Sequence, residues 1–504
     1  MADTTTHPPT PAAGDGDGDE RPRGLSRRGL LGGGAASALG LAMTGSLGGL
    51  ARAGGAEAAV RAAKPTAGVG YGPLVTDPAG LLSLPKRFRY TVVAESGVTT
   101  LEGGGVSPDF YDGTAAFPRP GGGSVLVANH EIRAPGSYQH GVPHVAGVTY
   151  DPGVEGGTTT IEVDADGARV REYVSLAGSS TNCAGGRTPW NTWLTCEETF
   201  EPANATKPHG YVFEVDPFDQ AANQDPTPIV ALGRFEHEAV AVDPDTGQIY
   251  ETEDANNPHG LLYRWTPPSE ALPLGKGSLG GLADDAGVLH AMQAFDHGTW
   301  VPDLCVATEP GTTYDVVWKP VPNRNPATLA DAVRQQFNGT WGGVTYTGRP
   351  GGNITRSRKL EGAWWGDGGA YIVASFARTG DGSAVQHDGQ VWFVDPLADT
   401  ITLVLRFAYT PADQNSDPDG PDNITVSPYG GVILAEDGEG RQHLVGATAA
   451  GQTYFLARNE VGDGSGEMTG PTYSADKSTL FANLFDPGHV YAITGPWRRI
   501  GKDG

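Results

Sequence analysis

Cysteine is scarce in this chain, and its scarcity excludes a disulfide scaffold. The 504 residues contain only three cysteines, Cys183, Cys196 and Cys305. An odd count of three is far below the density of folds that are stapled by sulfur. A single Cys183–Cys196 disulfide stays open as an alternative. The fold must therefore be held by its apolar core and its backbone hydrogen bonds.

Positive charge is also in short supply, which narrows the classes of partner. Lysine and arginine number 34 against 59 acidic residues, and the formal net charge is −25. Such a surface repels the phosphates of nucleic acids and of anionic membranes, so we expect neither as a partner. Two interpretations of the acidic residues remain open. They keep the protein soluble, or some of them bind hard cations such as Ca²⁺, which take clusters of oxygens.

Long apolar runs are missing as well, so we expect no stable membrane anchor. No segment approaches the ~20 apolar residues that cross a bilayer. Near the start, Ser26-Arg27-Arg28-Gly29-Leu30-Leu31 leads into a weakly apolar, Gly/Ala-rich stretch, and small-residue cleavage patterns follow at 51–53 and 56–58. Paired arginines ahead of a mildly hydrophobic segment indicate a twin-arginine export signal. An ordinary Sec signal or an uncleaved anchor is the alternative.

The signal predicts both a domain boundary and a location. We expect residues 1–58 to be a disordered leader with the signal peptide, and residues 59–504 to form a single domain. The partner in export would be the twin-arginine translocation machinery, and the destination the extracellular or cell-envelope space. That route carries folded proteins and is often used when a cofactor must be inserted first, which is a first hint of metal.

Glycine and proline are abundant, at 75 and 39 residues, more than a fifth of the chain. They punctuate a recurring pattern in which an apolar strand enters a turn, often Asp-Pro, and a second strand follows. Proline presets φ at such turns, and glycine or aspartate supplies the unusual backbone angles. The copies of the pattern lie at residues 147–152, 211–217, 239–250, 391–396, 424–434 and 472–481.

Repeated hairpins without helices between them predict small sheets stacked radially. We therefore expect an all-β fold, a β-propeller with six blades, although the irregular spacing of the copies does not count the blades. A short helical insertion is expected near residues 326–333. Two β-sandwiches remain an alternative, but no linker-like composition divides the chain after residue 60.

The densest candidate site lies in residues 182–198. Cys183 follows a polar residue and precedes three small ones, so a sharp, accessible turn there would let a thiolate meet a metal. Side chains alternate along a strand, so Glu197 and Glu198 face opposite sides and only one can reach a shared site. A small buried hydrophobe is the other interpretation of Cys183.

Further carboxylates stand beside apolar residues later in the chain. Glu238 opens an apolar strand, a placement that suits a rim ligand but also a solvated strand end. Glu361 precedes paired tryptophans, where a carboxylate wants a cation partner. The alternative there is a salt bridge to Lys359 or Arg358. The remaining candidates are Asp422, Asn423, Glu436 and Asp437.

The sequence contains no Gly-x-Ser-x-Gly elbow, no His-Glu-x-x-His helix and no phosphate-binding P-loop. Taken together, however, its candidate segments resemble the PhoX-type alkaline phosphatase family. The resemblance spans about residues 70–500, and the segment from the cysteine to the double glutamate is its most specific part. The matching segments are residues 182–198, 233–240, 361–365, 421–424, 436–437 and 493–497.

The resemblance implies an exported propeller that hydrolyses phosphate monoesters with two ferric ions and calcium ions, Fe³⁺ and Ca²⁺. Cys183 would be an iron ligand, with Glu198, Glu238 and Glu361 as carboxylate ligands of iron and calcium. Asp422, Asn423, Glu436 and Asp437 match outer calcium or structural positions. Lys359, the candidate catalytic residue, stands where the family leads us to expect a phosphate-binding arginine, so a point charge replaces a bidentate fork.

The mechanism implied by the resemblance is metal-assisted hydrolysis of small phosphate esters. Clustered cations would bind the phosphate oxygens, neutralise charge that builds during transfer and activate the attacking oxygen. Two other functions stay open. One is a calcium-only propeller hydrolase acting on a lactone or a phosphotriester, and the other is a non-enzymatic secreted propeller.

Overall fold

β-strands carry the whole fold, which we describe from a computed structural model. It describes residues 65–341, 344–410, 415–448 and 450–500; the predicted leader lies outside them. The named strands all pair in antiparallel fashion, and no α-helix occurs in the described ranges. Nor does any helix there have the length and apolar character to span a bilayer.

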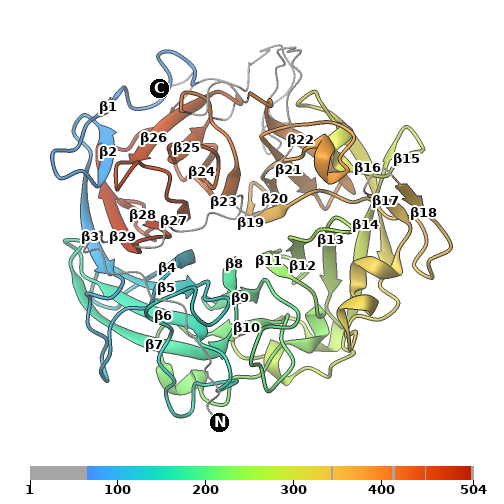
Figure 1. Cartoon of the computed structure of the whole chain (residues 1–504), viewed down its shortest axis with the longest axis horizontal. Helices are drawn as coiled ribbons and strands as arrows, with labels where there is room; N and C mark the ends of the chain where they lie inside the picture. The colour runs from blue at the N-terminus through green and yellow to red at the C-terminus, as the bar shows by residue number, and fades with distance from the viewer. Residues whose placement is uncertain (1–64, 342–343, 411–414, 449, 501–504) are drawn as a thin grey trace, which may run out of the picture.

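Six strands form a closed ring around the centre of the molecule (Figure 1). Each packs against the next ring strand in chain order, and the last packs against the first. We call these the ring strands: β4 (Tyr111–Pro118), β8 (Asn182–Arg187), β11 (His237–Val242), β19 (Leu360–Gly366), β23 (Pro421–Val426) and β27 (Met468–Tyr473).

From each ring strand the sheet continues outward, as the pairing order shows. Strand β4 is followed by β5 (Ser124–His130), β6 (Gly156–Val163) and β7 (Arg169–Ser179), and β8 by β9 (Trp193–Glu197) and β10 (Val212–Val215). Strand β11 is followed by β12 (Ile249–Glu253), β13 (Leu262–Thr266) and β14 (Val288–Asp296), and β15 (Thr299–Val301) pairs with β14. Strand β19 is followed by β20 (Gly369–Ala374), β21 (Gly389–Asp395) and β22 (Thr400–Phe407). Strand β23 is followed by β24 (Val432–Glu436), β25 (His443–Ala447), β26 (Thr453–Asn459), β2 (Leu82–Pro85) and β1 (Leu74–Val75). Strand β27 is followed by β28 (Thr479–Leu484), β29 (His489–Thr494) and β3 (Arg89–Glu95).

Two further pieces connect or decorate these sheets. Strand β16 (Thr313–Pro320) pairs with both β14 and β22 and so joins the sheets of β11 and β19 into one of ten strands. Strands β17 (Gly339–Trp341) and β18 (Val344–Tyr346) form a separate hairpin. The sequence prediction of an all-β propeller is confirmed. Hydrogen bonding does not divide the strands into six separate sheets, because β16 fuses two of them.

The sheet that begins at β27 is completed by strands from opposite ends of the described chain. Strand β3, near the start of the described chain, pairs with β29, near its end. Beside this seam Tyr71, Phe88 and Trp497 pack edge to face, with ring centroids 4.7–5.6 Å apart. Aromatic edge contacts of this kind add to the apolar area that they bury. The apolar core lies between neighbouring sheets, so closure is what completes it.

The Asp-Pro turns behave as the sequence predicts at three strand ends. Asp216, Asp243 and Asp395 each accept a hydrogen bond at 2.9 Å from the backbone N–H two residues later. Such Asx turns explain why aspartate precedes proline there. Five of the six predicted strand–turn segments contain named strands. The exception is residues 147–152, which form only an isolated parallel bridge between Thr149 and Ala177, while the backbone N–H groups of Tyr150 and Asp151 donate to the carbonyls of Ala177 and Gly178.

The predicted helical insertion is wrong in kind. Residues 326–333 contribute only short 3₁₀ turns, since Ala332 has an extended ψ of 149° that interrupts them. A helix this short cannot offset its nucleation cost by itself. Tertiary contacts decide instead, because Val333 and Arg334 are buried. The 3₁₀ helices are η3 (Gln220–Asn223), η4 (Val230–Leu232), η5 (Ser269–Ala271), η6 (Leu279–Gly281), η7 (Leu304–Val306), η8 (Leu329–Asp331), η9 (Val333–Gln336) and η10 (Thr379–Asp381).

Candidate metal centre

A β-bulge interrupts every ring strand near its start. At each bulge two residues of the ring strand oppose one residue of the next strand outward. A bulge of this kind bends the strand and re-aims a side chain, and it occurs often next to active sites. The first residues of the six bulges are Asp112, Cys183, Glu238, Glu361, Asp422 and Gly470.

The second bulge residue is mostly small, because neighbouring ring strands nearly touch there. A Cβ on Gly113 would lie 2.5 Å from Ala184 Cα, and a Cβ on Gly362 would lie 2.7 Å from the carbonyl oxygen of Asp422. Backbones that approach this closely leave no room for a side chain. The geometry of the ring therefore brings together the five bulge residues whose side chains can bind a metal, which are all the first bulge residues except Gly470.

Acidic side chains and one thiol form four overlapping groups at this place. Within each group the potential ligand atoms all lie within 4.8 Å of one another. Consecutive groups share a member, so they make one continuous row, which we call the candidate metal centre. The groups are Asp112, Glu131 and Cys183; Cys183, Glu198 and Glu238; Glu238, Glu361 and Asp422; and Asp422, Asp437 and Glu467.

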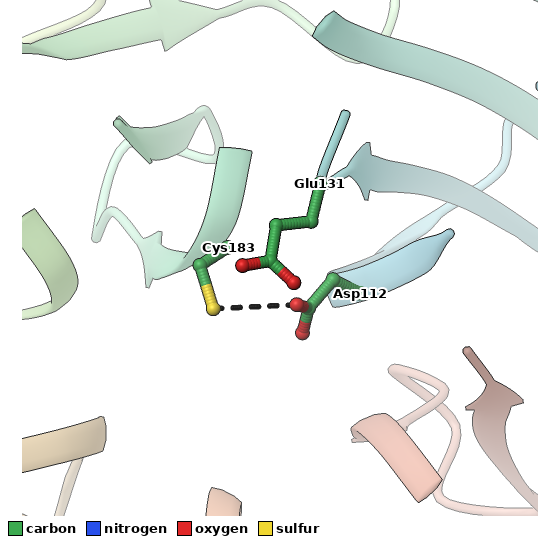
Figure 2. Close-up of side chains that lie close together, drawn as sticks. All are labelled: Asp112, Glu131 and Cys183. Atoms are coloured by element: carbon green, nitrogen blue, oxygen red, sulfur yellow. Dashed lines mark hydrogen bonds between the residues drawn. The ribbon is translucent and has the colours of Figure 1, made fainter. Parts of the chain in front are cut away.

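Cys183 belongs to the first two groups and is fully buried. Its sulfur lies 3.2 Å from Asp112 Oδ2 and 2.9 Å from Glu238 Oε1. Figure 2 shows its side chain directed toward Asp112 and Glu131. A thiol has one hydrogen and can donate to only one carboxylate at a time. A cation shared by the sulfur and the carboxylates would satisfy all three together.

Two consecutive acidic residues stand at the ends of β9 and β24, and the two residues of each pair have different roles. Glu197 accepts hydrogen bonds from the backbone N–H groups of Ser180, Gly210 and Tyr211 at 2.8–3.1 Å, while Glu198 joins the candidate centre. The predicted alternation of the two side chains is confirmed. The same division recurs at Glu436 and Asp437, where only Asp437 joins the centre.

Glu436, predicted together with Asn423 as an outer calcium or structural position, lies outside all four groups. Glu436 accepts from the backbone N–H groups of Asp419 and His443 at 3.1 and 2.8 Å, and burial raises its pKa well above the usual range. Asn423 accepts from the Gly470 N–H at 2.6 Å and donates to Asp422 Oδ1 at 2.9 Å. Both residues therefore hold the backbone around the centre.

Lys359 lies beside the centre and is bound to two acids. Its ammonium contacts Asp254, and it lies 2.8 Å from Glu361 Oε1. The salt bridge that sequence analysis left open for Glu361 is thus present. Lys359 also has a φ of 47°, a left-handed conformation that costs a non-glycine residue about 1 kcal/mol or more. Strained backbone of this kind is often found where a side chain must be aimed at a site.

The sequence analysis missed Asp112, Glu131 and Glu467. One signal could have revealed Asp112, because an acidic or thiol residue followed by Gly or Ala recurs as Cys183-Ala184, Glu238-Ala239 and Glu361-Gly362. Asp112-Gly113 has the same form. Glu131 and Glu467 flank strands that look ordinary in sequence. Only the ring places them next to the others.

The donor set fits transition-metal and calcium ions. Metal–ligand bonds of 2.0–2.6 Å place two donors on one ion no more than ~5 Å apart, and the 4.8 Å limit satisfies this. The first two groups combine sulfur with carboxylates, a set that suits a transition metal. The last two contain carboxylates alone, the oxygen ligands that Ca²⁺ prefers. None of the three cysteines forms a disulfide, so no disulfide competes for Cys183.

Comparison with known proteins places these features in a family. The family model described as "Alkaline phosphatase PhoX" matches residues 69–171 and 165–488. A solved structure, PhoX of Pseudomonas fluorescens in complex with vanadate, a transition state analogue, matches with a TM-score of 0.59 and 18% identity, covering 85% of this chain and 98% of that one.

A gluconolactonase structure from Xanthomonas campestris covers the same shares at 12% identity. Its TM-score of 0.39 is too low to support any conclusion. No curated protein sequence matches the chain.

Proposed function

Because the chain belongs to the PhoX alkaline phosphatase family and is therefore a phosphatase, we propose that it hydrolyses phosphate monoesters at the candidate metal centre, loaded with Fe³⁺ and Ca²⁺. The observation that carries the proposal is the continuous row of four groups along the ring strands. Carboxylates packed this closely repel one another when ionised, so cations stabilise their joint burial.

We assign the two kinds of ion by donor chemistry. Iron would be held by Cys183 with Asp112, Glu131, Glu198 and Glu238, because a thiolate favours a transition metal over calcium. Calcium would be held by Glu361, Asp422, Asp437 and Glu467, which offer only oxygen. When bound, such ions supply Lewis acidity toward a phosphoryl group and offset charge that develops during transfer.

The protein's own part is to hold and orient these groups. The bulges fix the ring-strand ligands on rigid strands. Glu197 and Glu436, which we call the two braces, accept hydrogen bonds from the backbone N–H groups of neighbouring segments and so hold those segments in place. Cys183 acts as a ligand and not as a nucleophile, since two carboxylates flank its sulfur. Lys359 supplies a positive charge at the edge of the centre, next to Glu361.

We count six blades in the propeller. Each ring strand begins one blade, each carries the same bulge, and the ring closes on itself. In this count β16 is an insertion that bridges two blades. Export as a folded protein suits a site that must be loaded with metal first.

The test is to purify the protein without chelator, measure iron and calcium per chain, and assay p-nitrophenyl phosphate at alkaline pH. Bound iron and calcium with phosphate release support the proposal. Turnover of a lactone or phosphotriester with calcium alone, or no turnover at all, would replace it with one of the two alternatives.

The export route has a separate test. Residues Arg27 and Arg28 lie outside the described ranges, and changing both to lysine should leave precursor in the cytoplasm, because the transport receptor recognises that pair. Normal export of the double variant would refute the twin-arginine assignment.

A further inference from the structure

Arg133 reaches solvent at a place where its charged neighbours do not. Its side chain is 44% exposed, whereas those of Glu131 and Glu198, its two contacts in the centre, are 0% and 10% exposed. We propose that Arg133 binds the phosphate group of the substrate at the entrance to the metal centre, a role that rests on the proposed phosphatase function.

The guanidinium of Arg133 lies over the junction of the two sulfur-containing groups. Its Nη2 and Nε lie 2.5 and 3.0 Å from Glu131 Oε1, and its Nη2 lies 3.7 Å from Glu198 Oε2. Glu131 belongs to the first group and Glu198 to the second, and the two groups share Cys183. An anion that approaches the iron ligands from solvent therefore meets Arg133.

The backbone around Arg133 is fixed to the segments that carry these ligands. The N–H of Thr181 donates to the carbonyl of Ile132 at 2.9 Å, and the N–H of Glu198 donates to the carbonyl of Thr181 at 2.9 Å. The N–H of Glu131 donates to the carbonyl of Phe110 at 3.0 Å. Arg133 is thus held in register with the centre, as a substrate-binding residue requires.

Arg133 also provides what the other cations near the centre do not. Lys359 is a point charge that is 8% exposed and contacts Asp254 and Glu361. Its neighbour Arg358 is 1% exposed, donates to Asp381 at 3.2 Å and stacks on Phe376. Bidentate binding of a phosphate needs the planar fork of an arginine. Among these three cations only Arg133 is a guanidinium with access from solvent, although its Nε and Nη2 also donate to Glu131.

The experiment compares Arg133→Gln and Arg133→Lys with the matched controls Arg171→Gln and Arg171→Lys in the metal-loaded protein. Arg171 is also 44% exposed and contacts a carboxylate, Glu162, at 2.6 Å, but lies outside the centre. Three quantities are measured: the Kd of inorganic phosphate by calorimetry, and the KM and kcat for p-nitrophenyl phosphate. Iron and calcium per chain are checked in every variant.

We expect Arg133→Gln to raise the phosphate Kd and the KM about tenfold, because charge-assisted hydrogen bonds of this kind are worth that much. Arg133→Lys should lie between Gln and the parent, and both Arg171 variants should match the parent. Metal content should not change.

Unchanged phosphate Kd and KM in Arg133→Gln would overturn the inference. Loss of iron without a change in KM would overturn it too, since Arg133 would then only position Glu131. If the parent binds phosphate but releases none from the ester, the proposed function fails, while the Kd arm still decides the role of Arg133.

Discussion

The two halves of the ring place different side chains at equivalent β-bulges. Strands β4, β8 and β11 offer Asp112, Cys183 and Glu238 at their bulges, a set that includes sulfur. Strands β19, β23 and β27 offer Glu361, Asp422 and, in place of a ligand, Gly470. Since the bulges are equivalent, the proposed assignment of iron to one half and calcium to the other rests on the side chains and not on the fold.

The largest expected effect comes from removing the sulfur of the first half. Cys183→Ser should lose most of its iron and reduce the phosphatase rate at least about 100-fold, because even partners outside the ligand set are worth 10–100-fold. Any colour from sulfur-to-iron charge transfer should bleach, while calcium remains. Iron per chain, the visible spectrum and p-nitrophenyl phosphate turnover measure this.

Cys305→Ser is the matched control for the thiol. Cys305 is buried away from the centre, and burial raises the pKa of its thiol, so it stays protonated. Its variant should keep iron and rate. Equal iron in Cys183→Ser, Cys305→Ser and the parent would remove Cys183 from the centre and end the distinction between the two halves.

The oxygen-only half should respond to a different treatment. EGTA should abolish activity and Ca²⁺ should restore it, while the iron of the first half stays bound. Asp437→Asn should raise the Ca²⁺ concentration needed for half-maximal activity about tenfold, because it replaces an anionic ligand with a neutral one. Full activity in excess EGTA, with no calcium detected, would contradict the calcium assignment.

A third pair separates a ligand from a brace. Asp112→Asn should lower iron content, whereas Glu436→Gln should leave both metals in place. Burial raises the folded-state pKa of Glu436, so its contribution to stability is present below about pH 4.5 and is lost as pH rises through the folded pKa. Unfolding midpoints from pH 5 to 9 should therefore fall less for Glu436→Gln than for the parent. Iron loss in Glu436→Gln would show that the brace was wrongly assigned.

The smallest expected effect contrasts the histidines that contact the two braces. His209, 2.6 Å from Glu197, has a raised pKa, because Glu197 and Asp151 outweigh the opposing effect of burial. His443, 2.9 Å from Glu436, has its pKa lowered to about 3 by burial and by nearby Arg458. The two braces therefore predict opposite dependences of stability on pH.

Stability from His443 should be lost as pH falls from 6.5 toward 3, at up to about 1.4 kcal/mol per unit. Stability from His209 is present below pH 6.5 and is lost as pH rises through its folded pKa. His443→Gln should therefore flatten the change in stability below pH 6.5, and His209→Gln should flatten the fall in stability above pH 6.5. Chemical unfolding measures the stability of each variant across this pH range. The same pH dependence of stability in both variants would contradict the contrast between the two histidines.

Much of the fold could be predicted from local patterns. Turn residues such as Asp243 predicted the strand ends correctly, because the aspartate side chain accepts a hydrogen bond from the backbone N–H two residues later. This interaction is local and does not depend on distant parts of the chain. The alternation of Glu197 and Glu198 was predictable for the same local reason. The segment at 147–152 failed because its backbone donors found partners in the 177–178 segment, a contact that no local pattern encodes.

The candidate site was less predictable than the fold. Six of the predicted ligands meet in the centre, but Glu436 does not, because its carboxylate accepts hydrogen bonds from the backbone N–H groups of Asp419 and His443. The missed residues Glu131 and Glu467 have no sequence signature of their own. Their role depends on which strands they lie beside.

By itself, the sequence determined the all-β character, the positions of most turns, and the run of acidic or thiol residues each followed by a small one. These features depend on backbone preferences of a few consecutive residues. Tertiary structure alone decided that Asp112 and Glu467, more than 350 positions apart, belong to one row of candidate ligands. It also committed Lys359 to two acids and placed Arg133 at the solvent edge. The physical reason is closure of the ring, which sets the register and approach of strands that are remote in the chain.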